Sequence, residues 1–167
     1  MTANGEPLYF TLNTSCDVIK VAASADGSSK EVTRMGTAQS AGARQSVQIG
    51  NELFQVEEGT KNCLWVNLSG VTRQENPMIA EATDFALCKM NESHVFVCGG
   101  QNSKVAQRFS VREKLWEALP ELNVPRAKAS AVAINGTVYV ICGMVMQGGE
   151  EDPYGSIEKL VSAGGPQ

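Results

Sequence analysis

The stretch that decides the fold is His94-Val95-Phe96-Val97-Cys98-Gly99-Gly100. A similar stretch, Thr137-Val138-Tyr139-Val140-Ile141-Cys142-Gly143, follows it, and Tyr139 lies 43 positions after Phe96. Towards the N-terminus, Phe54 lies 42 positions before Phe96. Such a period is typical of chains built from stacked supersecondary units, among them the four-stranded blades of β-propellers.

Three of the repeats begin with the pattern of a tight hairpin. The clearest hairpin joins 130–134 to 137–141 through Asn135-Gly136, a pair that suits a type I′ turn because both central residues need positive φ. We expect further strands at 18–21, 31–35, 63–66, 105–109, 114–118 and 156–160. Each unit is therefore predicted to be a four-stranded antiparallel meander, with little or no helix anywhere.

The period divides the chain into four units within a single predicted repeat region, 1–167. The expected blades cover about 8–37, 42–76, 80–120 and 126–161. The first, around Tyr9, begins at its second strand, and the last ends after its third, so fourteen strands are expected. Since propellers close with about four to eight blades, two explanations stay open. The chain is a fragment of a longer ring, or it is a short chain that closes by oligomerising or stays open.

One repeat carries a family resemblance. Gly99-Gly100, Phe109, Trp116 and the pair Pro125-Arg126 resemble a kelch repeat over about 92–143. In that family two glycines end the second strand, and a Tyr-x6-Trp pair packs between neighbouring blades; Phe109 stands at the tyrosine position. Glycine lets the backbone leave a strand where a side chain would clash. In the next repeat Tyr139 and Gly143 take the matching positions. The resemblance implies an all-β kelch-type propeller, whose rings usually have six or seven blades.

Composition narrows the function classes. The net charge is −4 and charged residues make up 19% of the chain. We expect no nucleic-acid partner, because the basic residues are scattered rather than clustered. No apolar run approaches the length of about 20 residues that spans a bilayer, and the N-terminus has no signal-peptide pattern. Five cysteines without a CxxC pair favour a reducing compartment, so we predict a cytoplasmic protein.

The sequence offers little for catalysis. His94 is the only histidine, and the five cysteines lie in different repeats, so we expect no metal site, no cofactor and no catalytic residue. A resemblance to the copper-radical galactose oxidase type of kelch enzyme would require two histidine ligands. We therefore predict that the chain is not an enzyme.

A partner-binding surface is predicted from three connections. The longest, 144–154, is interpreted as an acidic loop in which Gly148-Gly149 gives flexibility. In kelch rings such loops share a face with the connections between blades, where peptide partners often bind. The expected contact residues are Gln101, Asn102, Lys104, Arg126, Glu150, Glu151, Asp152 and Tyr154.

The predicted function is a non-catalytic protein-interaction module that binds a protein or peptide. It could serve as the substrate-recognition part of a larger adaptor, since many kelch proteins with a BTB domain recruit substrates to ubiquitin ligases. A homo-oligomer is expected if the chain is complete. Two alternatives stay open: an enzyme built on a propeller, and a truncated or degenerate fragment without independent function.

Overall fold

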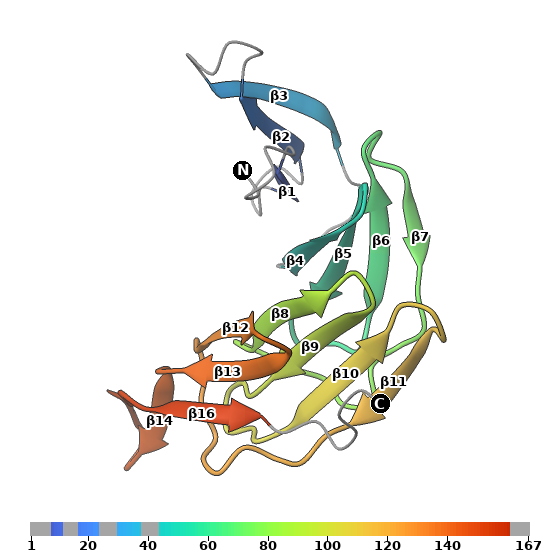
Figure 1. The fold of residues 1–167 in the computed structure, drawn as a ribbon. Helices are drawn as coiled ribbons and strands as arrows, with labels where there is room; N and C mark the ends of the chain where they lie inside the picture. The colour runs from blue at the N-terminus through green and yellow to red at the C-terminus, as the bar shows by residue number, and fades with distance from the viewer. Residues whose placement is uncertain (1–7, 12–16, 24–29, 38–43, 161–167) are drawn as a thin grey trace. The chain divides into compact units, whose positions relative to one another are not determined.

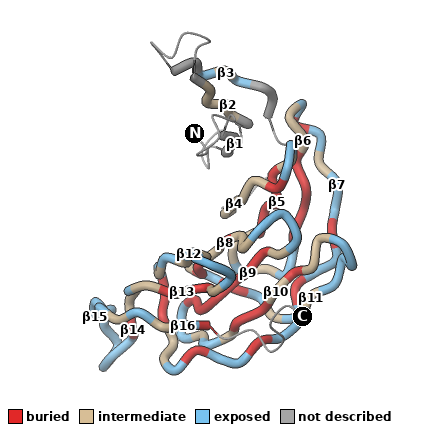
Figure 2. The backbone as a smooth tube through the Cα atoms, viewed as in Figure 1, coloured by how far each residue is buried: buried red, intermediate tan, exposed pale blue. Residues whose placement is uncertain are grey.

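The computed structural model describes residues 8–11, 17–23, 30–37 and 44–160. These residues form an all-β structure with no helix among them, as the sequence predicts. Among the same residues, no helix has the length and apolar character needed to cross a membrane. Figure 1 labels all of the strands except β15, which is labelled in Figure 2. They are β1 (Leu8–Thr11), β2 (Asp17–Ala23), β3 (Lys30–Thr37), β4 (Arg44–Ile49), β5 (Glu52–Glu57), β6 (Cys63–Asn67), β7 (Thr72–Gln74), β8 (Ala86–Asn91), β9 (His94–Cys98), β10 (Ala106–Ser110), β11 (Leu115–Ala118), β12 (Ser130–Ile134), β13 (Thr137–Ile141), β14 (Met144–Gln147), β15 (Glu150–Pro153) and β16 (Ile157–Leu160).

The strands pair antiparallel with their neighbours in sequence. The sheets have the orders β1-β2-β3, β4-β5-β6-β7 and β8-β9-β10-β11, each an uninterrupted meander. The fourth sheet has the order β12-β13-β16, and β14-β15 form a separate ribbon between β13 and β16. The four-stranded meanders confirm the predicted architecture of a complete repeat. The prediction of a single repeat region over 1–167 stays a prediction. The chain divides into two compact units, which are described separately below.

Unit 1 consists of Met1–Glu57 and Cys63–Glu75, and unit 2 of Glu58–Asn62 and Asn76–Gln167. In unit 1 most of the buried side chains come from β5 and β6, including Leu53, Phe54 and Trp65. Four consecutive residues are buried in each of these strands, 53–56 in β5 and 63–66 in β6, as expected for the two central strands of the sheet.

In unit 2 the two larger sheets pack face to face. Figure 2 shows buried stretches along β9, β10 and β13. Strands β8, β9 and β10 contribute Cys88, Phe96, Cys98 and Ala106 to one apolar cluster. The sheet β12-β13-β16 closes the cluster with residues such as Val138, Val140 and Leu160. Alternate residues of each strand point into the cluster, because side chains of a strand alternate between its two faces.

The turns follow the predicted chemistry. Asn135 and Gly136 both have positive φ, 49° and 74°, which confirms the hairpin expected from Asn-Gly. Residues 115–118 are a strand, as predicted, although their composition is also compatible with a short helix.

The structure differs from the prediction at residues 144–154. That segment is not an open loop: β14 and β15 form a two-stranded hairpin, which raises the strand number above fourteen in the described residues. Its turn is Gly148-Gly149, with φ of 60° and 91°. Two consecutive glycines with positive φ are the chemistry of a type I′ turn, so the pair shapes a hairpin and does not serve as a flexible spacer.

Candidate partner-binding surface

Glycines bring three connections together at one end of unit 2. The peptide N–H of Gly100 donates to the Arg126 carbonyl at 2.9 Å, and the N–H of Gln101 donates to the Thr83 carbonyl at 2.8 Å. A Cβ atom on Gly99 would lie 2.7 Å from the Arg126 carbonyl oxygen, and one on Gly100 would lie 2.7 Å from that of Thr83. Only glycine permits this approach, because real Cβ atoms do not come so close to a backbone oxygen.

A glycine also permits a close backbone approach in the segment that follows β13. Gly143 has φ of 111°, and its Cβ would lie 2.9 Å from the Ala127 carbonyl oxygen. Met144 and Ala127 exchange both backbone hydrogen bonds, at 2.8 and 2.9 Å. The N–H of Leu122 donates to the Lys104 carbonyl at 2.8 Å. The loop between β9 and β10, the connection between β11 and β12, and the start of β14 are therefore joined by backbone bonds.

The buried side chain of Arg126 stabilises this end of unit 2. The side chain is only 1% exposed. Its Nη1 donates to the carbonyls of Cys142 and Ser156 at 3.1 and 3.2 Å, and its Nη2 donates to Ser156 Oγ at 3.0 Å and to the Glu158 carboxylate at 3.3 Å. The guanidinium lies 5.0 Å from the centre of the Tyr154 ring. Arg126 thus connects the residues after β13 to β16.

The sequence predicts Arg126 as a contact residue, and the structure differs. Its side chain is buried because its hydrogen-bond acceptors, on Cys142, Ser156 and Glu158, lie 16 to 32 positions later in the chain and fold over it. Arg126 stabilises the surface from below. It also lines, with Asn123, Tyr154 and Lys159, an open cavity of about 340 Å³.

The acidic residues lie on the hairpin β14–β15. Glu150, Glu151 and Asp152 are all exposed. Lys128 Nζ donates to both carboxylate oxygens of Glu151, at 2.7 and 3.0 Å, which ties the hairpin to the connection before β12. This hydrogen bond raises the pKa of Lys128 above its usual value. Glu150 and Asp152 are two positions apart on β15 and therefore share a face.

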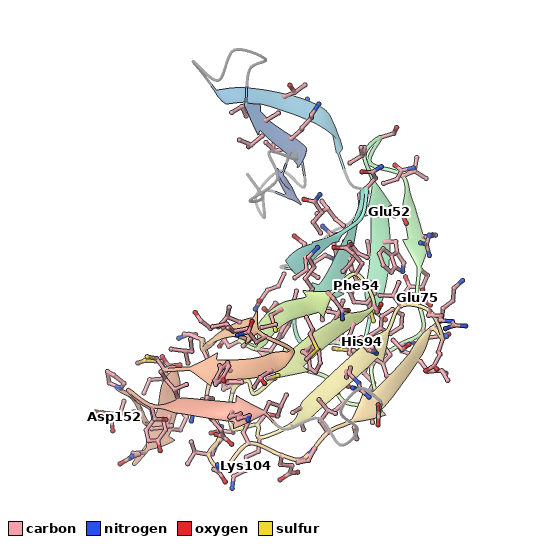
Figure 3. All side chains as sticks on the ribbon, viewed as in Figure 1. Glu52, Phe54, Glu75, His94, Lys104 and Asp152 are labelled. Atoms are coloured by element: carbon pink, nitrogen blue, oxygen red, sulfur yellow. The ribbon has the colours of Figure 1, made fainter. Side chains whose placement is uncertain are left out.

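The remaining predicted contact residues lie on the loop between β9 and β10. Gln101, Asn102 and Lys104 are exposed. Asn102 has φ of 53°, a left-handed conformation that asparagine tolerates better than most residues. Figure 3 labels Lys104 on this loop and Asp152 on the hairpin. This loop lies at the end of unit 2 that Arg126 stabilises, which we call the braced end. The Arg126 guanidinium also contacts the Tyr154 ring.

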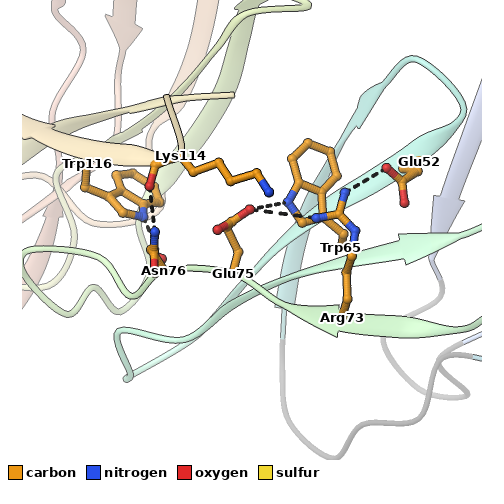
Figure 4. Close-up of polar contacts among 7 residues, drawn as sticks. All are labelled: Glu52, Trp65, Arg73, Glu75, Asn76, Lys114 and Trp116. Carbon is orange, nitrogen blue, oxygen red and sulfur yellow. Dashed lines mark hydrogen bonds and ion pairs between the residues drawn. The ribbon is translucent and has the colours of Figure 1, made fainter. Parts of the chain in front are cut away.

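The motif aromatics lie on strands of unit 2, away from this surface. Phe109 and Trp116 are cross-strand partners on β10 and β11, with ring centres 5.2 Å apart. Trp116 Nε1 donates to the Asn76 carbonyl at 3.0 Å, and Asn76 Nδ2 donates to the Lys114 carbonyl at 2.7 Å (Figure 4). Tyr139 lies half-buried on β13, opposite Val132.

Sequence reasoning missed a second aromatic pair, in unit 1. Phe54 and Trp65 are cross-strand partners with ring centres 4.9 Å apart in an edge-to-face arrangement. Trp65 Nε1 donates to the Glu75 carboxylate at 3.0 Å, and the Arg73 guanidinium lies 4.9 Å from the centre of the Trp65 ring (Figure 4). The repeat period does not reveal this pair. Phe54 lies 42 positions before Phe96, but the register partner of Phe96 on β10 is Arg108 and not an aromatic residue. Trp65 also does not match the position of Trp116 in the repeat, because Trp65 lies on the third strand of its sheet and Trp116 on the fourth.

His94 lies at the other end of unit 2. It begins β9 and borders a cavity of about 250 Å³ with Arg108, Glu113 and Trp116. Partial burial, with a smaller contribution from the nearby Arg108 charge, lowers the pKa of His94. Among the residues that the structure describes, no group of three histidine, cysteine or acidic side chains is arranged to hold a metal ion.

No protein-family model matches this chain, and no curated protein matches it significantly.

Proposed function

We propose that this chain is a kelch-type β-propeller region that acts as a non-catalytic protein-interaction module in the cytoplasm. The observation that carries the proposal is the braced end of unit 2, where two connections and a hairpin are joined by backbone bonds around Arg126. Loops held in this way present exposed side chains without the entropy cost that a mobile loop would incur on binding. Substrate recognition within a larger adaptor would use the same surface.

Three features support the kelch-type architecture. The sheets β4–β7 and β8–β11 are four-stranded meanders. Gly99 and Gly100 end β9 with positive φ where a side chain would clash. Phe109, which is buried, and Trp116, which is half-buried, are cross-strand partners with ring centres 5.2 Å apart.

The exposed charge favours a basic segment as the partner. Glu150 and Asp152 lie on the same face of β15, and Glu151 is paired with Lys128. A partner with lysine or arginine residues would gain association rate from this charge, and the effect would weaken with salt. A reducing compartment is supported by the free thiols of Cys63, Cys88, Cys98 and Cys142.

The test is quantitative affinity capture with the intact chain and a double variant, Glu150→Lys with Asp152→Lys. Both residues are exposed, so the substitutions leave the packing intact. The matched control reverses two charges at the other end of unit 2, Glu92→Lys with Glu113→Lys, in the turns after β8 and β10.

The expected result is a set of proteins that binds the unmodified chain and the control but is lost from the hairpin variant. Purified members of that set should then bind the chain directly, with an affinity that falls as salt rises. Equal capture by all three chains would refute the proposed surface.

A further inference from the structure

The sheet β12-β13-β16 buries one of its faces and exposes the other. The exposed face carries the alternate residues that do not enter the unit 2 cluster, and its apolar members are Val132, Ile134, Tyr139, Ile141 and Ile157. We call this the open face of the C-terminal sheet. Ile157 is 68% exposed and Ile134 52% exposed, an unusual exposure for two β-branched apolar residues on one sheet.

The same face of the preceding sheet is covered within this chain. Cys88, Phe96 and Ala106 occupy on β8, β9 and β10 the positions that Val132, Tyr139 and Ile157 occupy on β12, β13 and β16. The difference lies in burial: Ala106 is 2% exposed, whereas Ile157 is 68% exposed. The covering residues are Val138, Val140 and Leu160. The open face therefore corresponds by position to the face of the sheet β8-β9-β10-β11 that is already buried against β12-β13-β16.

The N-terminal sheet has a face of the same type as the one formed by Val138, Val140 and Leu160. Ile19 and Val21 alternate along β2, and Val21 pairs with Val32 on β3, so the three side chains share a face. Val21 follows Lys20, the register partner of Tyr9, just as Leu160 follows Lys159, the register partner of Tyr139. Leu160 is buried, whereas its counterpart Val21 is half-buried and Val32, on the same face, is 67% exposed. We call Ile19, Val21 and Val32 the open face of the N-terminal sheet.

We propose that the open face of the C-terminal sheet binds the open face of the N-terminal sheet of a second copy of this chain. Each face corresponds by position to one side of the interface formed inside unit 2, so the two are complementary rather than identical. A contact between different faces is head-to-tail, and it either closes into a ring or continues into an open assembly. Burial of the exposed isoleucine and valine side chains supplies the driving force.

The experiment measures the mass of the intact chain in solution at rising protein concentration, by sedimentation velocity. Two variants each damage one face: Ile157→Glu on the C-terminal sheet and Val32→Glu on the N-terminal sheet. Leu115→Glu is the control, because Leu115 is 61% exposed on β11, outside both open faces. All three replaced residues are exposed in one copy, so circular dichroism should show unchanged folding.

The chain and the Leu115→Glu control should self-associate, and each face variant alone should associate about 100-fold more weakly, because a charge would be buried without a partner. A mixture of the Ile157→Glu and Val32→Glu variants should form one-to-one dimers, since each variant keeps the face that the other has lost. Three results would overturn the proposal: a chain that stays monomeric, a Val32→Glu variant that associates like the unmodified chain, or a mixture that stays monomeric.

Discussion

Replacing Arg126 with methionine removes four donated hydrogen bonds from the interior of unit 2 and keeps most of the side-chain volume. The change leaves the carbonyls of Cys142 and Ser156 without these donors, and it leaves the Glu158 carboxylate, 11% exposed, without its cation. Removing one member of a buried ion pair costs about 3 to 5 kcal/mol of unfolding free energy. We expect a loss of that size for Arg126→Met.

Urea unfolding measures this loss, provided that the signal comes from unit 2 alone. The chain has two tryptophans, Trp65 in unit 1 and Trp116 in unit 2. In a Trp65→Phe background, fluorescence reports the unfolding of unit 2 through Trp116. The slope of free energy against urea should stay constant, because the variant does not change the surface exposed on unfolding.

Arg108→Met is the matched control in the same background. Arg108 also forms an ion pair, with Glu117, but that carboxylate is 53% exposed and the pair lies at the surface. Its loss should cost less than about 1 kcal/mol. If Arg126→Met costs no more than Arg108→Met, the bracing role assigned to Arg126 is wrong.

Two other perturbations test neighbouring features. Gly100→Ala should cost about 2 kcal/mol or more in urea unfolding, because φ is 125° and the new Cβ would lie 2.7 Å from the Thr83 oxygen; Gly148→Ala, with nothing within 4 Å, should cost about half as much. Burial raises the pKa of Cys88 to about 11 from 9.0, so its neutral thiol is favoured in the folded state. The contribution of this neutral thiol to the free energy of unfolding is complete below pH 9.0 and is lost as the pH rises towards about 11. Cys88→Ala should therefore flatten the plot of unfolding free energy against pH in this range. In native protein a thiol reagent should modify the exposed Cys142 well before Cys88, and equal rates would contradict this burial.

Local sequence patterns were sufficient to predict most of the strands and the hairpin turn at Asn135-Gly136. Asn135-Gly136 predicted its turn because both residues tolerate positive φ, and no distant contact was needed. The same reasoning applied to Gly148-Gly149 would have found β14 and β15. That prediction failed because the pair was interpreted by its composition and not by its position between two four-residue strands.

The candidate surface depended on contacts that the sequence does not reveal. Exposure of Glu150 and Asp152 follows from their charge, as predicted. Arg126 is also charged, yet it is buried. Glu158 on β16, and Ser156 just before that strand, fold over its side chain and accept its hydrogen bonds. Burial of a charged side chain is decided by its tertiary partners, so no local pattern distinguishes a brace from a contact residue.

Native-state hydrogen exchange tests most directly the claim that the connections form a rigid platform. The decisive amides are those of Gly100, Gln101 and Leu122, which donate to carbonyls of other connections or loops. If the platform is rigid, these amides should exchange as slowly as those of β9 and β10, because they open only when unit 2 unfolds. Exchange at the rate of an unstructured chain would contradict the rigid presentation of the loops and, with it, the proposed interaction surface.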